Sequence, residues 1–320
     1  MVRIAYLGPE GTFTEAALLQ ITAAGLVPER EPDAVRRLPI ESTPAALDAV
    51  RDGDADYACV PIENSIDGSV IPTLDSLAIG SPLQVFAETT LDVAFSIVVN
   101  PGRSAADVRT LAAFPVAAAQ VRRWLATHLA GAELRPAYSN ADAARQVAEG
   151  QADAAVTSPL AAAHWELAAL ADGVVDEPNA RTRFVLIGLP GPPPARTGAD
   201  RTSVVLRIDN APGALLAALA EFGIRGIDLT RIESRPTRTE LGTYLFFADC
   251  VGHIDDGAVA EALKALHRRC ADVRYLGSWP TGSGAGVLPP PADEASRWLA
   301  QLRAGKSEQA QTSGSGGFEP

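Results

Sequence analysis

The sequence is poor in the residues that build disulfides and metal sites. Its 320 residues include three cysteines and four histidines. The cysteines, at 59, 250 and 270, lie far apart and form no C-x-x-C pair, which argues against a disulfide framework and favours a reducing compartment. The histidines, at 128, 164, 253 and 267, are not at metal-ligand spacing, which argues against a zinc site.

Long apolar runs and nucleotide motifs are also missing. No run of apolar residues approaches the length that spans a membrane, and no signal-peptide pattern opens the chain. Neither a Walker A motif, a G-x-G-x-x-G motif nor an H-E-x-x-H motif occurs. We therefore expect a cytoplasmic protein that needs no metal, nucleotide or other cofactor.

Positive charge is scarce. Lys and Arg number 27 against 39 for Asp and Glu, a net charge of −12, which disfavours nucleic acid and membrane surfaces as partners. A site for an anionic substrate must therefore gain its positive potential locally, from an arginine or from helix N-termini. Hydrophobic residues make up 47% of the chain, enough for packed cores.

Composition divides the chain into two domains, a linker and a tail. Expected strands and helices alternate over 1–190, with one of the helices over 159–170, which predicts an α/β fold with mostly parallel strands. The Pro-rich segment PGPPPARTGAD predicts a linker at 191–201, and residues 202–279 read as βαββαβ, a ferredoxin-like order. Residues 280–320 read as a low-complexity mobile tail, with a docked terminal helix carrying Trp298 and Leu302 as the alternative.

An internal echo suggests two lobes within 1–190. Shifting the chain by 97 residues places 42–58 on 139–155, and matches Ser42 with Ser139 and Gly53 with Gly150. Each copy reads as a capped helix, a Gly stop and a strand that ends in a polar loop. We expect one lobe of about 1–80 plus 178–190, a second of about 81–177, and a ligand cleft between them. Convergence of common helix-to-strand turns is the alternative.

Three loop segments stand out as candidate sites: Gly8-Pro9-Glu10-Gly11-Thr12-Phe13, Val60-Pro61-Ile62-Glu63-Asn64-Ser65 and Asn179-Ala180-Arg181-Thr182-Arg183-Phe184. Glycines in the first let the backbone approach a ligand, and Thr12 can cap a helix whose free N–H groups attract anions. Each segment also has a structural interpretation: a tight turn, an Asx-type turn, and solvated arginines beside a strand.

These segments, in this order and at this spacing, resemble the prephenate dehydratase family. The likeness covers nearly all of 1–189 through LGPEGTFTEAA, VPIENSIDGSV and NARTRFVLIG. The segments Gly213–Leu215 and Glu233–Pro236 look like those of the ACT domain attached to these enzymes. One departure is Phe114-Pro115-Val116, where many relatives carry His-Pro-Gln. No chorismate mutase region precedes residue 1, so a monofunctional enzyme is expected.

The resemblance implies a fold like that of type II periplasmic binding proteins, and the conversion of prephenate to phenylpyruvate with loss of carbon dioxide and water. It makes Thr182 the essential hydroxyl, a positioner or proton relay, and Arg183 the partner of a substrate carboxylate. The remaining expected substrate contacts are Gly11, Thr12, Phe13, Glu63, Asn64, Ser65, Ser158 and Phe184.

The resemblance also implies feedback by L-phenylalanine at an interface between two ACT domains, in a homodimer or homotetramer. The expected effector residues are Asn210, Ala211, Pro212, Gly213, Ala214, Leu215, Glu233, Ser234 and Arg235. An ordinary helix start at 212–215 is the structural alternative. Two functional alternatives stay open: an arogenate dehydratase, and a non-catalytic small-molecule binding or sensor protein with the same fold.

Overall fold

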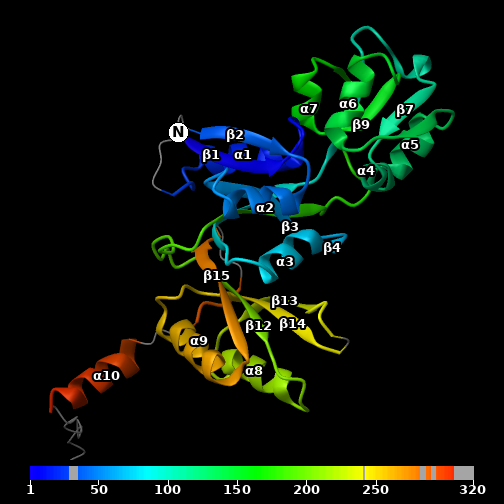
Figure 1. The fold of residues 1–320 in the computed structure, drawn as a ribbon. Helices are drawn as coiled ribbons and strands as arrows, with labels where there is room; N and C mark the ends of the chain where they lie inside the picture. The colour runs from blue at the N-terminus through cyan, green and yellow to red at the C-terminus, as the bar shows by residue number, and fades with distance from the viewer. Residues whose placement is uncertain (29–34, 241, 282–285, 290–292, 306–320) are drawn as a thin grey trace, which may run out of the picture.

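The computed structural model describes residues 1–28, 35–240, 242–281, 286–289 and 293–305. The chain forms three parts that are stacked along one direction, with the first lobe in the middle, the second lobe on one side and the C-terminal domain on the other (Figure 1). The two-lobed α/β architecture followed by a ferredoxin-like domain confirms the predicted fold class.

The first lobe is a sheet with strand order β2-β1-β3-β11-β5, and β4 pairs with β3. Helix α1 packs on one face against β1, and α2 and α3 cover the other face. The bounds are β1 (Val2–Leu7), β2 (Val35–Ile40), β3 (Tyr57–Asn64), β4 (Gly68–Ser69), β5 (Gln84–Asp92), β11 (Arg181–Gly188), α1 (Phe13–Ala23), α2 (Thr43–Arg51) and α3 (Ile71–Ala78).

The second lobe is a sheet with strand order β10-β6-β9-β7-β8. Helix α6 packs against β9, and α7 lies beside α6. The bounds are β6 (Phe95–Val99), β7 (Thr110–Ala113), β8 (Glu133–Pro136), β9 (Ala154–Thr157), β10 (Ala168–Val174), η2 (Ala105–Asp107), α4 (Pro115–Gln120), α5 (Arg122–His128), α6 (Asn140–Ala148) and α7 (Pro159–His164).

The internal echo corresponds to real structural equivalence. Ser42 and Ser139 each cap a nine-residue helix, α2 and α6, through a bond to the amide three residues on. Gly53 and Gly150 follow with φ of 78° and 73°, a conformation that favours glycine. The chain then enters β3 in one lobe and β9 in the other.

Three expectations about the lobes are wrong. The sheets are mixed: β1 and β7 have parallel neighbours, but β11 is antiparallel to both β3 and β5. This follows from the chain leaving the first lobe along β5 and returning along β11. Because β5 belongs to the first sheet, the crossing lies after Asp92 rather than at 80. The helix expected over 159–170 ends at His164, and Ala168–Val174 is the strand β10 instead.

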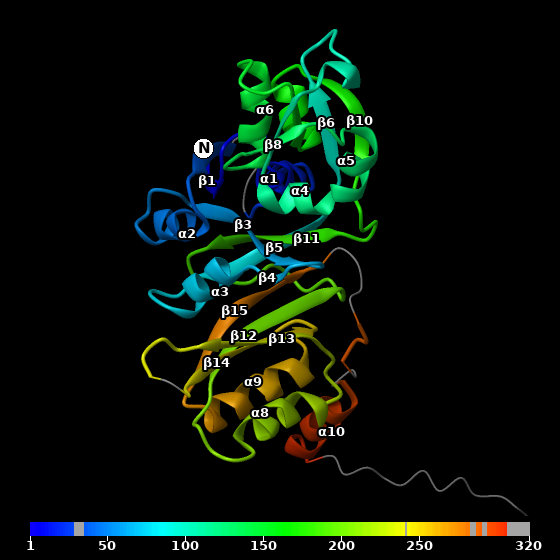
Figure 2. The same cartoon turned by 90° about the vertical axis from the view of Figure 1, so that its right-hand side faces the viewer.

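The C-terminal domain has the predicted βαββαβ order. Its strands are β12 (Asp200–Arg207), β13 (Leu229–Pro236), β14 (Tyr244–Val251) and β15 (Asp272–Pro280), in the sheet order β13-β14-β12-β15, and its helices are α8 (Ala214–Gly223) and α9 (Gly257–Arg269). Figure 2 shows both helices on the far side of this sheet from the first lobe.

The other face of that sheet packs directly on the first lobe. Val205, Phe247 and Trp279 belong to the same hydrophobic cluster as Val60 and Val85. Gly277 permits the close approach, because a Cβ at this position would lie 2.4 Å from the carbonyl oxygen of Val85. The two domains predicted from the sequence therefore share one core.

Beyond β15, the expected tail is partly outside the described residues, at 282–285, 290–292 and 306–320. The described part contains α10 (Asp293–Arg303), with Trp298 and Leu302 about half exposed. The backbone amide of Val287 donates to Asp228 of the C-terminal domain.

Candidate active site

A cavity of about 820 Å³ lies between the two lobes. The first lobe contributes the ends of β1 and β2, the start of α1 and part of β11. The second lobe contributes Phe114 and the start of α6. The lining residues are Leu7, Gly8, Pro9, Thr12, Phe13, Thr14, Pro39, Ile40, Glu41, Pro61, Phe114, Tyr138, Ser139, Asn140, Asp142, Thr182 and Phe184. The cleft predicted between the lobes is therefore present.

Thr182 lies in the wall of this cavity and is held by Asn64. The side-chain Nδ2 of Asn64 donates to Thr182 Oγ1 at 2.8 Å. The amide orientation follows from the other end of the group, because Asn64 Oδ1 accepts from the amides of Ile66 and Asp67 at 2.8 and 3.0 Å. Thr182 Oγ1 is thus an acceptor toward Asn64, which leaves its proton available for a bond into the cavity.

A β-bulge sets this pairing. Thr182 lies opposite Asn64 and Arg183 opposite Glu63, but Phe184 lies opposite Pro61, so β3 holds one extra residue at Ile62. Bulges re-aim side chains beside functional sites. Alternation along β11 then directs Thr182 and Phe184 toward the cavity and Arg183 to the opposite face.

Arg183 therefore does not line the cavity, in disagreement with the expected carboxylate contact. Its guanidinium is 7% exposed and lies between the first lobe and the C-terminal domain. It pairs with Asp249 at 2.8 Å, Glu63 at 2.9 Å and Glu88 at 3.2 Å. Burial alone would lower its pKa, but Asp249 and Glu88 hold the pKa above its ordinary value, so it remains charged.

Arg183 belongs to a cluster of three arginines and three carboxylates, all of them buried except Glu63, which is 37% exposed. Arg201 lies 3.5 Å from Glu88, and Arg231 lies 2.9 Å from Asp249. Burial raises the pKa of Asp249, but Arg231 and Arg183 lower it further, so its pKa lies below the ordinary 3.8. We call Arg183, Arg201, Arg231, Glu63, Glu88 and Asp249 the interdomain charge cluster.

Three other expected contacts form bridges instead of cavity wall. Ser158 donates its hydroxyl to the carbonyl oxygen of Gly11, which joins the second lobe to the first. A Cβ on Gly11 would lie 2.8 Å from that of Ala161, so glycine permits this close contact. Ser65 Oγ donates to the carbonyl of Asn179 and accepts from the amide of Arg181, which joins β3 to β11.

Thr12 and Phe13 line the cavity as expected, and Thr12 caps α1. Thr12 Oγ1 accepts from the amide of Glu15 at 3.3 Å, and Glu15 accepts from the amide of Gly11 at 2.6 Å. The first amides of a helix have no partner within the helix. The start of α1 therefore presents free N–H groups beside the cavity.

The second lobe lines the cavity with residues other than the predicted Ser158. Tyr138, Ser139, Asn140 and Asp142 line the cavity at the start of α6, where Ser139 caps the helix. The echo already paired Ser139 with Ser42 as a helix cap, and that match was the available signal. The lining residues include the carboxylates of Glu41 and Asp142 and no arginine or lysine, so the free amides at the starts of α1 and α6 are the groups in this wall that favour an anion.

The expected effector residues lie on two faces of the C-terminal domain. Gly213 caps α8 with φ of 78°, and residues 210–213 are largely exposed. Ser234 is exposed and lies opposite Phe246, which packs with the helices. Glu233 and Arg235 face the other way, toward the first lobe.

Two observations bear on metals and membranes. Among the described residues, no group of three or more His, Cys, Asp or Glu side chains is arranged to hold a metal ion. None of the described helices combines the length and apolar character needed to cross a membrane.

Comparisons with known proteins match both parts of the chain. A family model described as prephenate dehydratase matches residues 4–191, and an ACT domain model matches 202–268. Curated relatives named prephenate dehydratase include one from Mycobacterium tuberculosis (strain ATCC 25618 / H37Rv), 85% identical over 97% of this chain and 96% of its own, and one from Mycobacterium leprae (strain TN), 83% identical over 99% of both.

Solved structures point the same way. The prephenate dehydratase of Arthrobacter aurescens, in complex with L-Phe, has a TM-score of 0.84 and 39% identity over 95% of this chain and all of its own. A protein described as a quorum-quenching acylase has a TM-score of 0.74 and 30% identity over 87% of this chain and 98% of its own. The chain belongs to the prephenate dehydratase family, lyases of phenylalanine biosynthesis, and its C-terminal domain is an ACT domain.

Proposed function

We propose that the cavity between the lobes is where this enzyme converts prephenate to phenylpyruvate, carbon dioxide and water. The observation that carries the proposal is the hydroxyl of Thr182 in the cavity wall, which Asn64 holds from behind at 2.8 Å. In this reaction the ring carboxylate leaves as carbon dioxide, and the electron pair of the broken C–C bond enters the ring. The ring hydroxyl leaves with its own bonding pair and takes up a proton to become water.

Thr182 serves the leaving oxygen. Because Thr182 Oγ1 accepts from Asn64, its O–H is free to donate a hydrogen bond to the departing hydroxyl and to relay a proton to it, and a proton from solvent restores the threonine hydroxyl. Asn64 is fixed in turn by the two amides that its carbonyl oxygen accepts. The pair presents a donor that is oriented before the substrate arrives, which is the arrangement that stabilises charge developing in a transition state.

The starts of α1 and α6 hold the two carboxylates of prephenate from opposite lobes. Both helices begin at the cavity wall, and their free amides and dipoles favour negative charge. Phe13, Phe114 and Phe184 supply apolar surface for the ring. Enclosing the dianion between the lobes excludes water and strengthens each polar contact.

Product identification tests this function. The pure protein is incubated with prephenate and, separately, with arogenate, and we expect phenylpyruvate to form from prephenate at the higher kcat/KM. Preferential formation of phenylalanine from arogenate would contradict the assigned substrate.

The quorum-quenching acylase of similar structure raises a second candidate activity. No histidine or cysteine is among the residues that line the cavity of this chain, so the cavity does not offer the usual base-activated nucleophile of an acylase.

Phenylalanine is the proposed effector, bound at the exposed surface formed by residues 210–215 and Ser234. The relative from Arthrobacter aurescens is described in complex with L-Phe, which supports this assignment. Glycine at 213 leaves the start of α8 open, since no atom lies within 4 Å of where its Cβ would be. The free amides of this helix start suit the carboxylate of an amino acid.

The assembly is proposed to be a homodimer or a homotetramer built on paired C-terminal domains. β13 is the edge strand of the sheet, and its Ile232 is 48% exposed, while Leu216 and Ile224 of the same domain are both 74% exposed. An unpaired edge with exposed apolar side chains is suited to a second copy of the same domain. The cytoplasm is the proposed compartment, which suits the free thiols of all three cysteines.

A further inference from the structure

Strand β13 of the C-terminal domain has two faces with different neighbours. Glu233 and Arg235 lie opposite Phe247 and Leu245, which pack into the core of the first lobe. Ser234, between them, lies opposite Phe246, which packs with α8 and α9. Glu233 and Arg235 are therefore turned away from the proposed phenylalanine surface, although they adjoin it in sequence.

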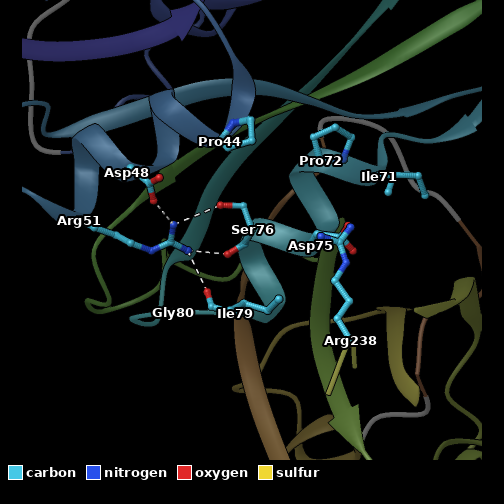
Figure 3. A pocket seen from close by; sticks show the side chains of 10 residues that line it. All are labelled: Pro44, Asp48, Arg51, Ile71, Pro72, Asp75, Ser76, Ile79, Gly80 and Arg238. Carbon is cyan, nitrogen blue, oxygen red and sulfur yellow. Dashed lines mark hydrogen bonds and ion pairs between the residues drawn. The ribbon is translucent and has the colours of Figure 1, made fainter. Parts of the chain in front are cut away.

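Both side chains bind the first lobe. Ser69 Oγ, in β4, donates to Glu233 Oε2 at 3.0 Å. Arg235 makes a two-pronged contact with Asp75 of α3, at 3.0 and 3.3 Å, the geometry in which an arginine fixes a carboxylate most strictly. Arg238 also pairs with Asp75, at the edge of a second cavity of about 480 Å³ (Figure 3).

The segment that they hold leads to the catalytic pair. β4 pairs with β3 so that Ser69 lies opposite Glu63 and Gly68 opposite Asn64. Asn64 holds the turn between these strands through the amides of Ile66 and Asp67, and it donates to Thr182. A continuous series of polar contacts thus runs from β13 to the hydroxyl in the cavity wall.

A second set of polar contacts crosses the same interface. The two sets differ in how deeply their central side chains are buried. At the centre of the interdomain charge cluster, Arg183 and Asp249 are 7% and 1% exposed, although Glu63 at its edge is 37% exposed, so separating this central pair leaves unpaired charge in the interior. Asp75, Arg235 and Arg238 are 13%, 18% and 59% exposed. Their contacts exchange with water at lower cost. The ion pairs of the charge cluster can therefore stay formed as a fixed pivot, while the contacts of β13 with the first lobe rearrange.

We propose that Glu233 and Arg235 couple the effector site to the active site by holding Ser69 and Asp75, and that they are not phenylalanine ligands. This inference rests on the proposed regulation by phenylalanine. A ligand on the Ser234 face acts only if it favours one arrangement of β13 over another. A shift of β13 changes its contacts with β4 and α3, and β4 transmits the change to Asn64 and Thr182.

The test removes the partners in the first lobe, which lie outside the proposed effector surface. Asp75→Asn and Ser69→Ala are compared with wild type for phenylalanine binding by calorimetry and for prephenate turnover with and without saturating phenylalanine. We expect the phenylalanine Kd to stay within about 2-fold, while the factor by which phenylalanine inhibits turnover falls by about 5-fold or more in Asp75→Asn. Ser69→Ala should show a smaller loss of the same kind.

Two control variants remove carboxylates that bind arginine within one domain. Asp48 pairs with Arg51 in the same cavity as Asp75 (Figure 3), and Glu221 binds Arg225 and Arg269 at a burial similar to that of Asp75. Asp48→Asn and Glu221→Gln should keep the wild-type response.

The outcomes separate this inference from the proposed regulation. Equal inhibition in wild type, Asp75→Asn and Ser69→Ala, with binding retained, overturns the coupling role. A loss of phenylalanine binding in either variant also overturns it, because Ser69 or Asp75 would then act on affinity. If Asp75→Asn does not fold, Ser69→Ala decides. A wild-type enzyme that phenylalanine neither binds nor inhibits refutes the regulation itself, and the coupling with it.

Discussion

Replacing Arg183 with methionine distinguishes a structural role in the interdomain charge cluster from the substrate-binding role that the sequence predicted. Methionine keeps the length of the side chain and removes its charge. In the interdomain charge cluster it leaves two arginines facing three carboxylates, and Asp249 loses a partner at 2.8 Å. Breaking a buried ion pair from one side costs about 3–5 kcal/mol. At about 2–4 °C per kcal/mol for a chain of this size, we expect Tm to fall by roughly 6–20 °C.

A double-mutant cycle shows whether Asp249 is the partner. Asp249→Asn alone leaves three arginines and two carboxylates, whereas the double variant restores a balance of two and two. We expect the double variant to be less destabilised than the sum of the single variants, by about 0.5–3 kcal/mol. Thermal and urea unfolding measure the cycle.

Steady-state kinetics supply the deciding comparison. Because Arg183 is absent from the cavity wall, KM for prephenate should change by less than about 3-fold in the folded Arg183→Met enzyme. Removing an arginine that binds a substrate carboxylate typically costs about 2–5 kcal/mol. An unchanged Tm together with a KM raised more than about 10-fold would refute the structural role and restore Arg183 as a substrate ligand.

Three further predictions concern catalysis, assembly and pH. Thr182→Val should lower kcat on the order of 10²-fold or more without loss of fold, and Asn64→Leu should lower kcat more than it raises KM; near-normal turnover in either variant removes that residue from the mechanism. Ile232→Glu should dissociate the assembly in sedimentation because it places charge at the exposed edge of β13, and an unchanged sedimentation coefficient would place the interface elsewhere. Since the pKa of Asp249 lies below 3.8 in the folded state, its contribution to stability is present above about pH 4 and is lost as pH falls through the folded pKa. In Asp249→Asn, Tm should therefore fall less steeply with decreasing pH than in wild type, and an equal fall in both proteins would contradict this.

The sequence predicted most accurately what local chemistry determines. Ser42 and Ser139 cap their helices as the echo indicated, and the order of the C-terminal domain follows its turns and hydrophobic pattern. Thr182 and Phe184 line the cavity as expected. In each case the signal lies within a few residues of the feature.

What the sequence did not reveal depends on partners far away along the chain. Alternation in β11 means that Thr182 and Arg183 cannot share a face, but only the packed C-terminal domain shows which of them it covers. β10 carries the alanine-rich sequence AALADGV, which resembles a helix, and becomes a strand by pairing with β6. β2 is half exposed and contains two arginines and a proline, so it lacks the pattern of a buried strand.

Because the first lobe and the C-terminal domain share one core, the first lobe can complete its fold only late in synthesis. Trp279, in the last strand of the C-terminal domain, is 1% exposed and donates to Glu88 of the first lobe at 2.9 Å. The first lobe thus lacks a part of its interior until β15 leaves the ribosome, although its own last strand ends at Gly188. At about 5–20 residues per second, the intervening ~90 residues take roughly 5–20 s. The catalytic half therefore completes its fold only after this delay, when the ACT domain on the same chain has already been synthesised.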